Sequence, residues 1–101
     1  MMDNKMILEA IALKRCIEVT FNRMRMKLAP HILYSRHGEL FLDAVAVERE
    51  GRTPDEAKLG RFKVAGLQIA QVIAKPFQPL PAFNAGNQNY REATLVAVGY
   101  R

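Results

Sequence analysis

The sequence has little of the chemistry that holds small disulfide-bonded or metal-binding domains together. Its 101 residues include one cysteine, Cys16, and two histidines, His31 and His37. A single cysteine cannot form an internal disulfide, and no Cys/His spacing resembles a zinc site. We therefore expect no metal and no cofactor, and we predict that Cys16 is a buried apolar thiol. A reactive thiol is the alternative, but no histidine is placed by sequence to activate it.

Long apolar runs and the usual catalytic motifs are also missing. No uninterrupted apolar segment could span a bilayer, and Glu9 and Lys14 interrupt the N-terminal region where a signal peptide would be apolar. We expect a cytoplasmic protein that does not enter a membrane. The sequence has no GxSxG, no glycine-rich phosphate loop and no HExxH, so we expect no enzyme. The alternative is a small hydrolase with Asp43 as general base and Glu39 nearby, although a buried carboxylate paired with an arginine explains Asp43 more simply.

Basic residues are what the sequence has in excess. They outnumber acidic residues 15 to 10, which gives a net charge of +5 and a pI of about 9.7. This balance favours anionic partners without proving that one binds. Hydrophobic residues make up 50% of the chain and charged residues 25%, which is typical of a folded protein. We predict a single domain over residues 1–101, with a core at about 7–74 and a C-terminal tail at 75–101.

The N-terminal region has helical periodicity. Asp3 or Asn4 can cap a helix, and apolar residues such as Met6, Ile7 and Ile11 recur at helical spacing after it. We predict a helix from about 4 to 15, whose apolar stripe must pack on a sheet or on another copy of the chain.

After this helix the apolar residues recur at every second position, which is typical of strands. We predict a first strand at 17–21, a tight turn at Asn22-Arg23 and a second strand at 24–28. Pro30 should end regular pairing or mark an edge, with residues 31–35 still extended.

A predicted turn at 36–38 leads into the longest apolar stretch, residues 38–48. Leucines and alanines alternate there with Phe41, Asp43 and Val45. Both faces of this strand are largely apolar, so we expect both faces to be covered.

The remaining segments are predicted from alternation and from proline and glycine content. They are a polar loop at 48–60, a strand at 61–67, a strand with an irregular end at 67–74, a tail over the surface at 75–89 and a closing strand within 93–100. A short helical turn is the alternative at 67–74. Apolar side chains that should anchor the tail or fill a gap are Phe77, Leu80, Phe83 and Tyr90.

The strongest functional pattern is a set of basic residues on predicted strands. The set consists of Arg23, Arg25, Lys27, Arg61 and Lys63. Alternating cations lie about 7 Å apart along a strand, which approximates the spacing of successive phosphates in an extended nucleic acid. We predict that the set forms one contiguous patch that binds nucleic acid. A solvated outer face is the alternative.

Three further residues near the basic strands are candidates for the same site. His31 could donate to a phosphate or stack on a base, or it could be satisfied by backbone carbonyls. Tyr34 is the best stacking candidate because its hydroxyl tolerates water. Phe41 could also stack, which is worth about 1–3 kcal/mol per base. Phe62 should pack in the core instead.

With these segments in place, the sequence resembles the WYL domain family over roughly residues 7–72. The resemblance rests on residues 17–21 (IEVTF), 30–33 (PHIL), 38–42 (GELFL) and 61–64 (RFKV). The Trp and Tyr of the family's naming motif are Leu40 and Phe41 here, and Leu42 is kept.

The resemblance implies a mainly β fold: a small Sm-like or SH3-like barrel with an N-terminal α-helix and, here, an extended C-terminal tail ending in a strand. It also implies a ligand-sensing module with a regulatory role in bacterial transcription or defence, which binds single-stranded nucleic acid or a nucleotide-like anion. The positions that match the family's basic and ligand-facing positions are Arg25, His31, Phe41, Arg61 and Lys63.

The family's DNA-reading domain has no counterpart in this sequence. We therefore expect the domain to act with a separate partner or as a homo-oligomer, most simply a dimer. The alternative function is that of a structural protein that self-associates through the apolar face of its helix.

Overall fold

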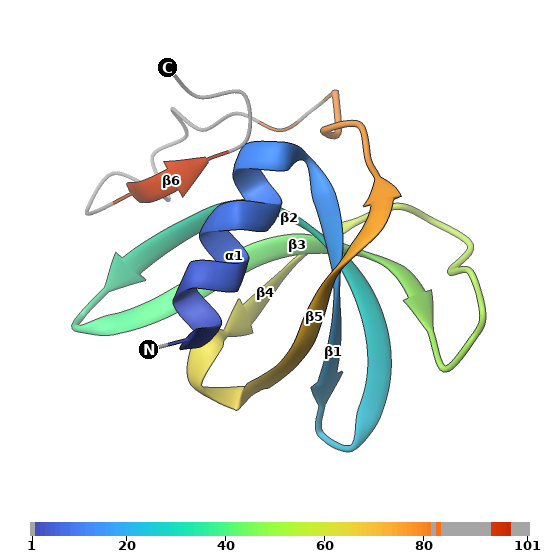
Figure 1. Cartoon of the computed structure of the whole chain (residues 1–101), viewed down its shortest axis with the longest axis horizontal. Helices are drawn as coiled ribbons and strands as arrows, with labels where there is room; N and C mark the ends of the chain where they lie inside the picture. The colour runs from blue at the N-terminus through green and yellow to red at the C-terminus, as the bar shows by residue number, and fades with distance from the viewer. Residues whose placement is uncertain (1, 82, 84–93, 98–101) are drawn as a thin grey trace.

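The chain folds as a strongly twisted antiparallel sheet with one helix packed on it (Figure 1). The computed structural model describes residues 2–81, 83 and 94–97. Its elements are α1 (Met2–Leu13), β1 (Arg15–Phe21), β2 (Met24–Arg36), β3 (Glu39–Arg49), β4 (Leu59–Lys63), the 3-10 turn η1 (Val64–Gly66), β5 (Leu67–Pro76) and β6 (Thr94–Ala97). The strands follow the order β4-β3-β2-β1-β5, with β6 paired to β2, and the sheet is not closed. The prediction of a mainly β fold with an N-terminal helix is confirmed.

The predicted helix is present as α1, which lies two residues earlier than predicted, so that Asp3 and Asn4 fall within it. It packs on the chain's own sheet. Its apolar stripe contacts β5, β1 and β2, and Ile7, Ala10 and Ile11 are buried. Leu8 and Leu13 lie outside the stripe and remain 41% and 51% exposed. The apolar stripe therefore packs against the chain's own sheet, and the exposed face of α1 is a different face that carries Leu8 and Leu13.

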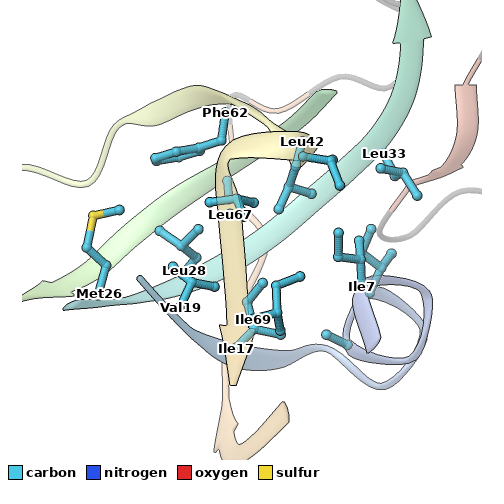
Figure 2. Close-up of a cluster of buried hydrophobic side chains, with 14 of the residues drawn as sticks. Ile7, Ile17, Val19, Met26, Leu28, Leu33, Leu42, Phe62, Leu67 and Ile69 are labelled. Atoms are coloured by element: carbon cyan, nitrogen blue, oxygen red, sulfur yellow. The ribbon is translucent and has the colours of Figure 1, made fainter. Parts of the chain in front are cut away.

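The main core lies between α1 and one face of the sheet. Figure 2 shows Ile7 of α1 near the inward-facing side chains of the strands. Alternation along each strand supplies them, for example Ile17 and Val19 from β1 and Leu67 and Ile69 from β5. Burial of this cluster provides the main favourable term in folding, at about 25 cal/mol per Å² of apolar surface.

The second face of the sheet is also covered in part, as predicted for the central strand. Leu42 and Ala44 of β3 point into the main core, whereas Val45 lies in a second apolar cluster with Cys16 and Ala29. The tail residues Phe77 and Leu80 pack against this second cluster. Both faces of β3 are therefore in contact with apolar side chains.

Two tight hairpins were predicted correctly. Asn22 and Arg23 have positive φ angles of 51° and 64°, the pattern of a type I′ turn, which matches the right-handed twist of paired strands. At the β2–β3 turn, His37 and Gly38 have φ angles of 51° and 80°. His37 is exposed there.

Pro30 does not end β2, contrary to one of the two predictions made for it. The strand continues to Arg36, and its pairing with β3 shifts between Pro30 and Ile32, where His31 is the extra residue of a β-bulge. On the other side of β2, β1 pairs as far as Leu28 and β6 begins at Ile32. The missing N–H of Pro30 therefore falls where regular pairing is already interrupted, which is the local edge that the alternative predicted.

The predicted strand at 61–67 is too long. β4 ends at Lys63, and the η1 turn follows before β5 begins at Leu67. The turn passes close to β1, since a Cβ on Gly66 would lie 3.2 Å from the Phe21 ring. Glycine allows this close approach.

The neighbouring predictions are closer to the structure. Residues 67–74 lie in β5, whose pairing with β1 contains register shifts, so the predicted strand with irregularity is confirmed. The polar loop is shorter than predicted, because β3 extends to Arg49 and β4 starts at Leu59.

The tail anchors behave as predicted within the described residues. Phe77, Leu80 and Phe83 are partly buried against the apolar clusters. β6 confirms a closing strand within residues 93–100. Tyr90 lies outside the described residues.

Replacing Ile7 by alanine should strongly destabilise the fold. Ile7 is 0% exposed in the core, so Ile7→Ala removes buried methyl groups and leaves a cavity, at a cost of about 2–5 kcal/mol in the free energy of unfolding. Urea denaturation followed by circular dichroism measures this cost. Leu8→Ala on the same helix should change it by less than about 0.5 kcal/mol. Equal effects of the two variants would contradict the packing of α1.

Candidate functional site

The five predicted cations occupy two separate regions of the sheet. Lys27 pairs with Glu48 of β3, whereas Arg61 pairs with Asp43. Glu48 lies five positions after Asp43 on β3, which corresponds to roughly 16 Å along an extended strand. The prediction of one contiguous patch is therefore wrong, because a pattern of alternating cations does not specify where each strand pairs.

The first region surrounds the start of β2. Arg25 Nη2 lies 3.4 Å from Glu18 Oε2, and Lys27 Nζ lies 3.3 Å from Glu48 Oε1. Glu50 Oε1 accepts a hydrogen bond from the Arg25 backbone N–H at 3.0 Å. Arg23 lies beyond these contacts, in the hairpin turn.

A hollow of about 360 Å³ opens in this first region. It is lined by Glu18, Arg25, Met26, Lys27, Glu48, Glu50 and Gly51. A hydrogen bond from Gln71 and the nearby Arg25 lower the pKa of Glu18. Three carboxylates therefore face two cations in the hollow, and this balance does not favour a phosphate.

The second region is centred on Phe41, on the outer face of β3. Lys63 of β4 lies directly opposite Phe41 in the strand register. The Arg61 guanidinium carbon lies 5.9 Å from the centre of the Phe41 ring, which is within the range of a cation–π contact. On the other side, Tyr34 of β2 is opposite Phe41, with ring centres 5.9 Å apart in a stacked arrangement.

Arg36 belongs to this second region, although it was not among the predicted site residues. It lies two positions after Tyr34 on β2 and opposite Glu39, so it projects from the same face as Phe41. Lys63, Arg61 and Arg36 are thus cross-strand or diagonal neighbours of one half-buried aromatic ring. The two-residue spacing from Tyr34 is the sequence signal that Arg36 shares the face of Tyr34. The predicted turn at 36–38 includes Arg36 and so leaves it out of the predicted site.

Carboxylates accompany these cations as well. Lys63 Nζ lies 3.5 Å from Glu39 Oε2, and Arg61 Nε lies 3.9 Å from Asp43 Oδ1. The Arg61 and Lys63 side chains are 46% and 60% exposed. The exposed Lys63–Glu39 pair contributes about 0–1 kcal/mol, so a phosphate can compete for Lys63. The partner of Arg61 is the buried Asp43, but the half-exposed Arg61 side chain lies within reach of a phosphate at the surface.

Asp43 is a buried carboxylate that contacts Tyr34 and Arg61. Tyr34 donates its hydroxyl hydrogen to Asp43 Oδ1 at 2.8 Å, and both residues are buried. Burial, followed by this hydrogen bond to the carboxylate, raises the pKa of Tyr34 to about 12. The interpretation of Asp43 as a buried carboxylate paired with an arginine is confirmed. Tyr34, predicted to be the best stacking residue, is 1% exposed and cannot offer its ring to a base.

His31 is also buried, and both of its ring nitrogens have partners. Nδ1 lies 2.9 Å from the carbonyl oxygen of Ala29, and Nε2 accepts the backbone N–H of Leu80 at 3.0 Å. These contacts require the neutral ring with its hydrogen on Nδ1. Burial lowers the pKa of His31. His31 is therefore satisfied by backbone groups, as the alternative predicted, and its buried ring is not available to a phosphate or a base at the surface.

The remaining candidates have apolar surroundings. Cys16 is buried and unpaired, and burial raises the pKa of its thiol, which disfavours the reactive thiolate. Phe62 is buried in the main core, as predicted (Figure 2). Among the described residues, no group of three His, Cys, Asp or Glu side chains could hold a metal ion.

Comparisons with known proteins identify no relative. Neither the protein-family models, nor the curated proteins, nor the solved structures contain a match to this chain. In the part of the chain that the structure describes, no helix has the length and hydropathy needed to cross a membrane.

Removing the Tyr34 hydroxyl should destabilise the protein and change its alkaline titration. Tyr34→Phe leaves buried Asp43 without this donor, at a cost of about 1.5–3 kcal/mol in the free energy of unfolding. Because the folded-state pKa of about 12 exceeds the ordinary value of 10, the stabilisation from Tyr34 is complete below pH 10 and is lost as pH rises from 10 towards 12.

Ultraviolet titration of wild type and Tyr34→Phe, with urea denaturation of both at neutral pH, measures these effects. The difference spectrum should show one phenol that ionises near pH 12. A phenol that ionises near pH 10 in this difference would contradict the buried hydrogen bond.

Proposed function

We propose that this protein is a non-catalytic binding module for single-stranded nucleic acid or a nucleotide-like anion, which it contacts at the second region of the sheet. The observation that carries the proposal is the half-buried Phe41 ring with the Arg61 guanidinium over it and Lys63 directly opposite. A base stacks on this ring when the half-exposed Arg61 side chain swings off it, and Arg61 and Lys63 then hold the adjoining phosphates.

The composition of the two basic regions supports this choice of site. Lys63, Arg61 and Arg36 surround Phe41 with two carboxylates, Glu39 and Asp43, among them. The hollow near the start of β2 has the opposite balance, with three carboxylates and two cations. A polyanion is therefore attracted to the face around Phe41 more than to the hollow.

The position of Phe41 supports a stacking role as well. Tyr34 backs the ring from β2, and the pair is fixed by strand pairing on both sides of β3. A ring held in this way loses little conformational entropy when a base stacks on it. Arg61 and Lys63 alternate on β4, about 7 Å apart along the strand, which suits neighbouring phosphates.

The proposal includes an Sm-like or SH3-like barrel of the WYL type. Its support is the strand order β4-β3-β2-β1-β5 with a helix at the start and a 3-10 turn before β5. We further propose a cytoplasmic ligand-sensing role in transcription or defence, in which the protein acts with a partner or as a dimer. A dimer formed through the apolar stripe of α1 is not favoured, because that stripe is buried on the sheet.

Binding of a fluorescein-labelled oligothymidylate, followed by anisotropy at several salt concentrations, tests the proposal. Phe41→Leu should raise Kd by roughly 5- to 150-fold, the equivalent of the about 1–3 kcal/mol that one stacked base contributes. Arg61→Gln with Lys63→Gln should reduce the slope of log K against log salt by about 0.7 for each lost phosphate contact.

A matched control removes the same charge from the other region. Arg25→Gln with Lys27→Gln should leave Kd within about twofold of wild type, because these cations face three carboxylates. The proposal fails if wild type does not bind at low salt, if binding is independent of salt, or if the control pair weakens binding as much as the Arg61 and Lys63 pair.

A further inference from the structure

A short tail segment lies across the outer face of the sheet at the bulge in β2. We call residues 77–81 the strap. The Phe77 backbone N–H donates to the carbonyl of Lys14 at 3.1 Å, and the Phe83 N–H donates to the carbonyl of Leu80 at 3.0 Å. Between these points, Leu80 is held by the side chain of His31.

The hydrogen bond from Leu80 to His31 uses the one backbone donor between two prolines of the strap. Pro79 and Pro81 have no backbone N–H, so Leu80 carries the one amide donor of this three-residue stretch. That donor bonds to Nε2 of His31 at 3.0 Å. The His31 ring also lies 5.3 Å from the Phe77 ring and 5.2 Å from the Phe83 ring, measured between ring centres.

We infer that His31 is a pH-sensitive latch, which holds the strap over the sheet while its imidazole is neutral and releases it when Nε2 takes up a proton. A proton on Nε2 converts the acceptor of the Leu80 N–H into a second donor, so the two groups then repel each other. The inference concerns the strap and stands independently of the proposed nucleic-acid site.

The strap covers apolar surface that opening would expose. Phe77 and Leu80 pack on a cluster that includes Cys16, Ala29 and Val45. The strap itself contains no charged residue, so its closed position depends on these contacts, on the Phe77–Lys14 backbone hydrogen bond and on the His31 hydrogen bond.

Several packed elements bring ionisable groups near His31 and the cluster under the strap. Asp43 of β3 favours the charged imidazole, but its carboxylate also accepts from Tyr34 and pairs with Arg61. From β1 and β5, Cys16 and Lys75 lie near the covered cluster, where Lys75 acts on the Cys16 thiol. Burial is the largest influence on His31 and opposes its protonation in the closed state.

The direction of the pH effect follows from that burial. The ordinary pKa of an imidazole is about 6.5, and burial under the closed strap lowers the pKa of His31 below this value. The closed state is therefore fully favoured above pH 6.5 and loses stability as pH falls below it. The equilibrium constant for opening should rise by up to about tenfold between pH 7.5 and pH 5.5.

Hydrogen exchange of the Leu80 amide on the wild-type protein, measured by NMR at pH 7.5, 6.5 and 5.5, tests the latch. After correction for intrinsic exchange, the Leu80 protection factor should fall by up to about tenfold. Amides in the β1–β2 ladder, such as that of Val19, should keep their protection. The His31 ring carbon shifts, recorded in parallel, should follow the same pH dependence as the Leu80 amide.

Two variants complete the test. His31→Phe keeps an aromatic ring between Phe77 and Phe83 but cannot titrate, so Leu80 protection should be low and independent of pH. His37→Asn removes the exposed histidine at a left-handed turn position that asparagine tolerates, and it should behave as wild type. The latch is refuted if wild-type Leu80 protection does not change between pH 7.5 and 5.5, or if it falls only together with that of Val19.

Discussion

The β-bulge at His31 is the constraint on which the rest of this structure depends. β2 pairs with β1, β3 and β6, and its register against β3 shifts between Pro30 and Ile32. Because side chains alternate along a strand, one extra residue exchanges the two faces. Leu28 before the bulge and Leu33 after it therefore point into the same core. Without the extra residue, Tyr34 would face that core and could not lie opposite Phe41.

The bulge also links the core, the strap and the candidate binding face. It places the His31 ring where regular pairing is interrupted, so that its Nε2 can receive the Leu80 N–H. A few residues further on, it sets Tyr34 against Phe41 and Asp43. The sites for the strap and for the proposed ligand are therefore consequences of one irregularity in one strand.

Local patterns predicted much of this fold. Helical spacing around Ile7 located α1, alternation after Cys16 located β1, and the two-sided apolar pattern of 38–48 correctly indicated that both faces of β3 are in contact with apolar residues. The end of β4 at Lys63 was missed because the close approach of Gly66 to Phe21 joins distant parts of the chain.

The candidate site was harder to predict, for the same physical reason. Alternation indicated that Lys27 and Arg61 face outward. Their separation depends on the strand register, which places Lys27 opposite Glu48 and Arg61 opposite Asp43, and this register is set by pairing across the sheet. Tyr34 cannot stack on a base because its side chain is buried and its hydroxyl donates to the buried carboxylate of Asp43. Phe41 is the stronger stacking candidate because three cations from the two neighbouring strands surround it. One of these cations, Arg36, falls in a segment that the sequence predicts to be a turn.

The central claim is that anion binding takes place on the β3–β4 face around Phe41. Its most direct test is a two-dimensional NMR titration of the labelled protein with an unlabelled oligothymidylate at low salt. We predict that the largest shift changes occur at Phe41, Arg61, Lys63 and Arg36, with small changes at Arg25 and Lys27. No change in the spectrum, or changes centred on Arg25 and Lys27, would contradict it.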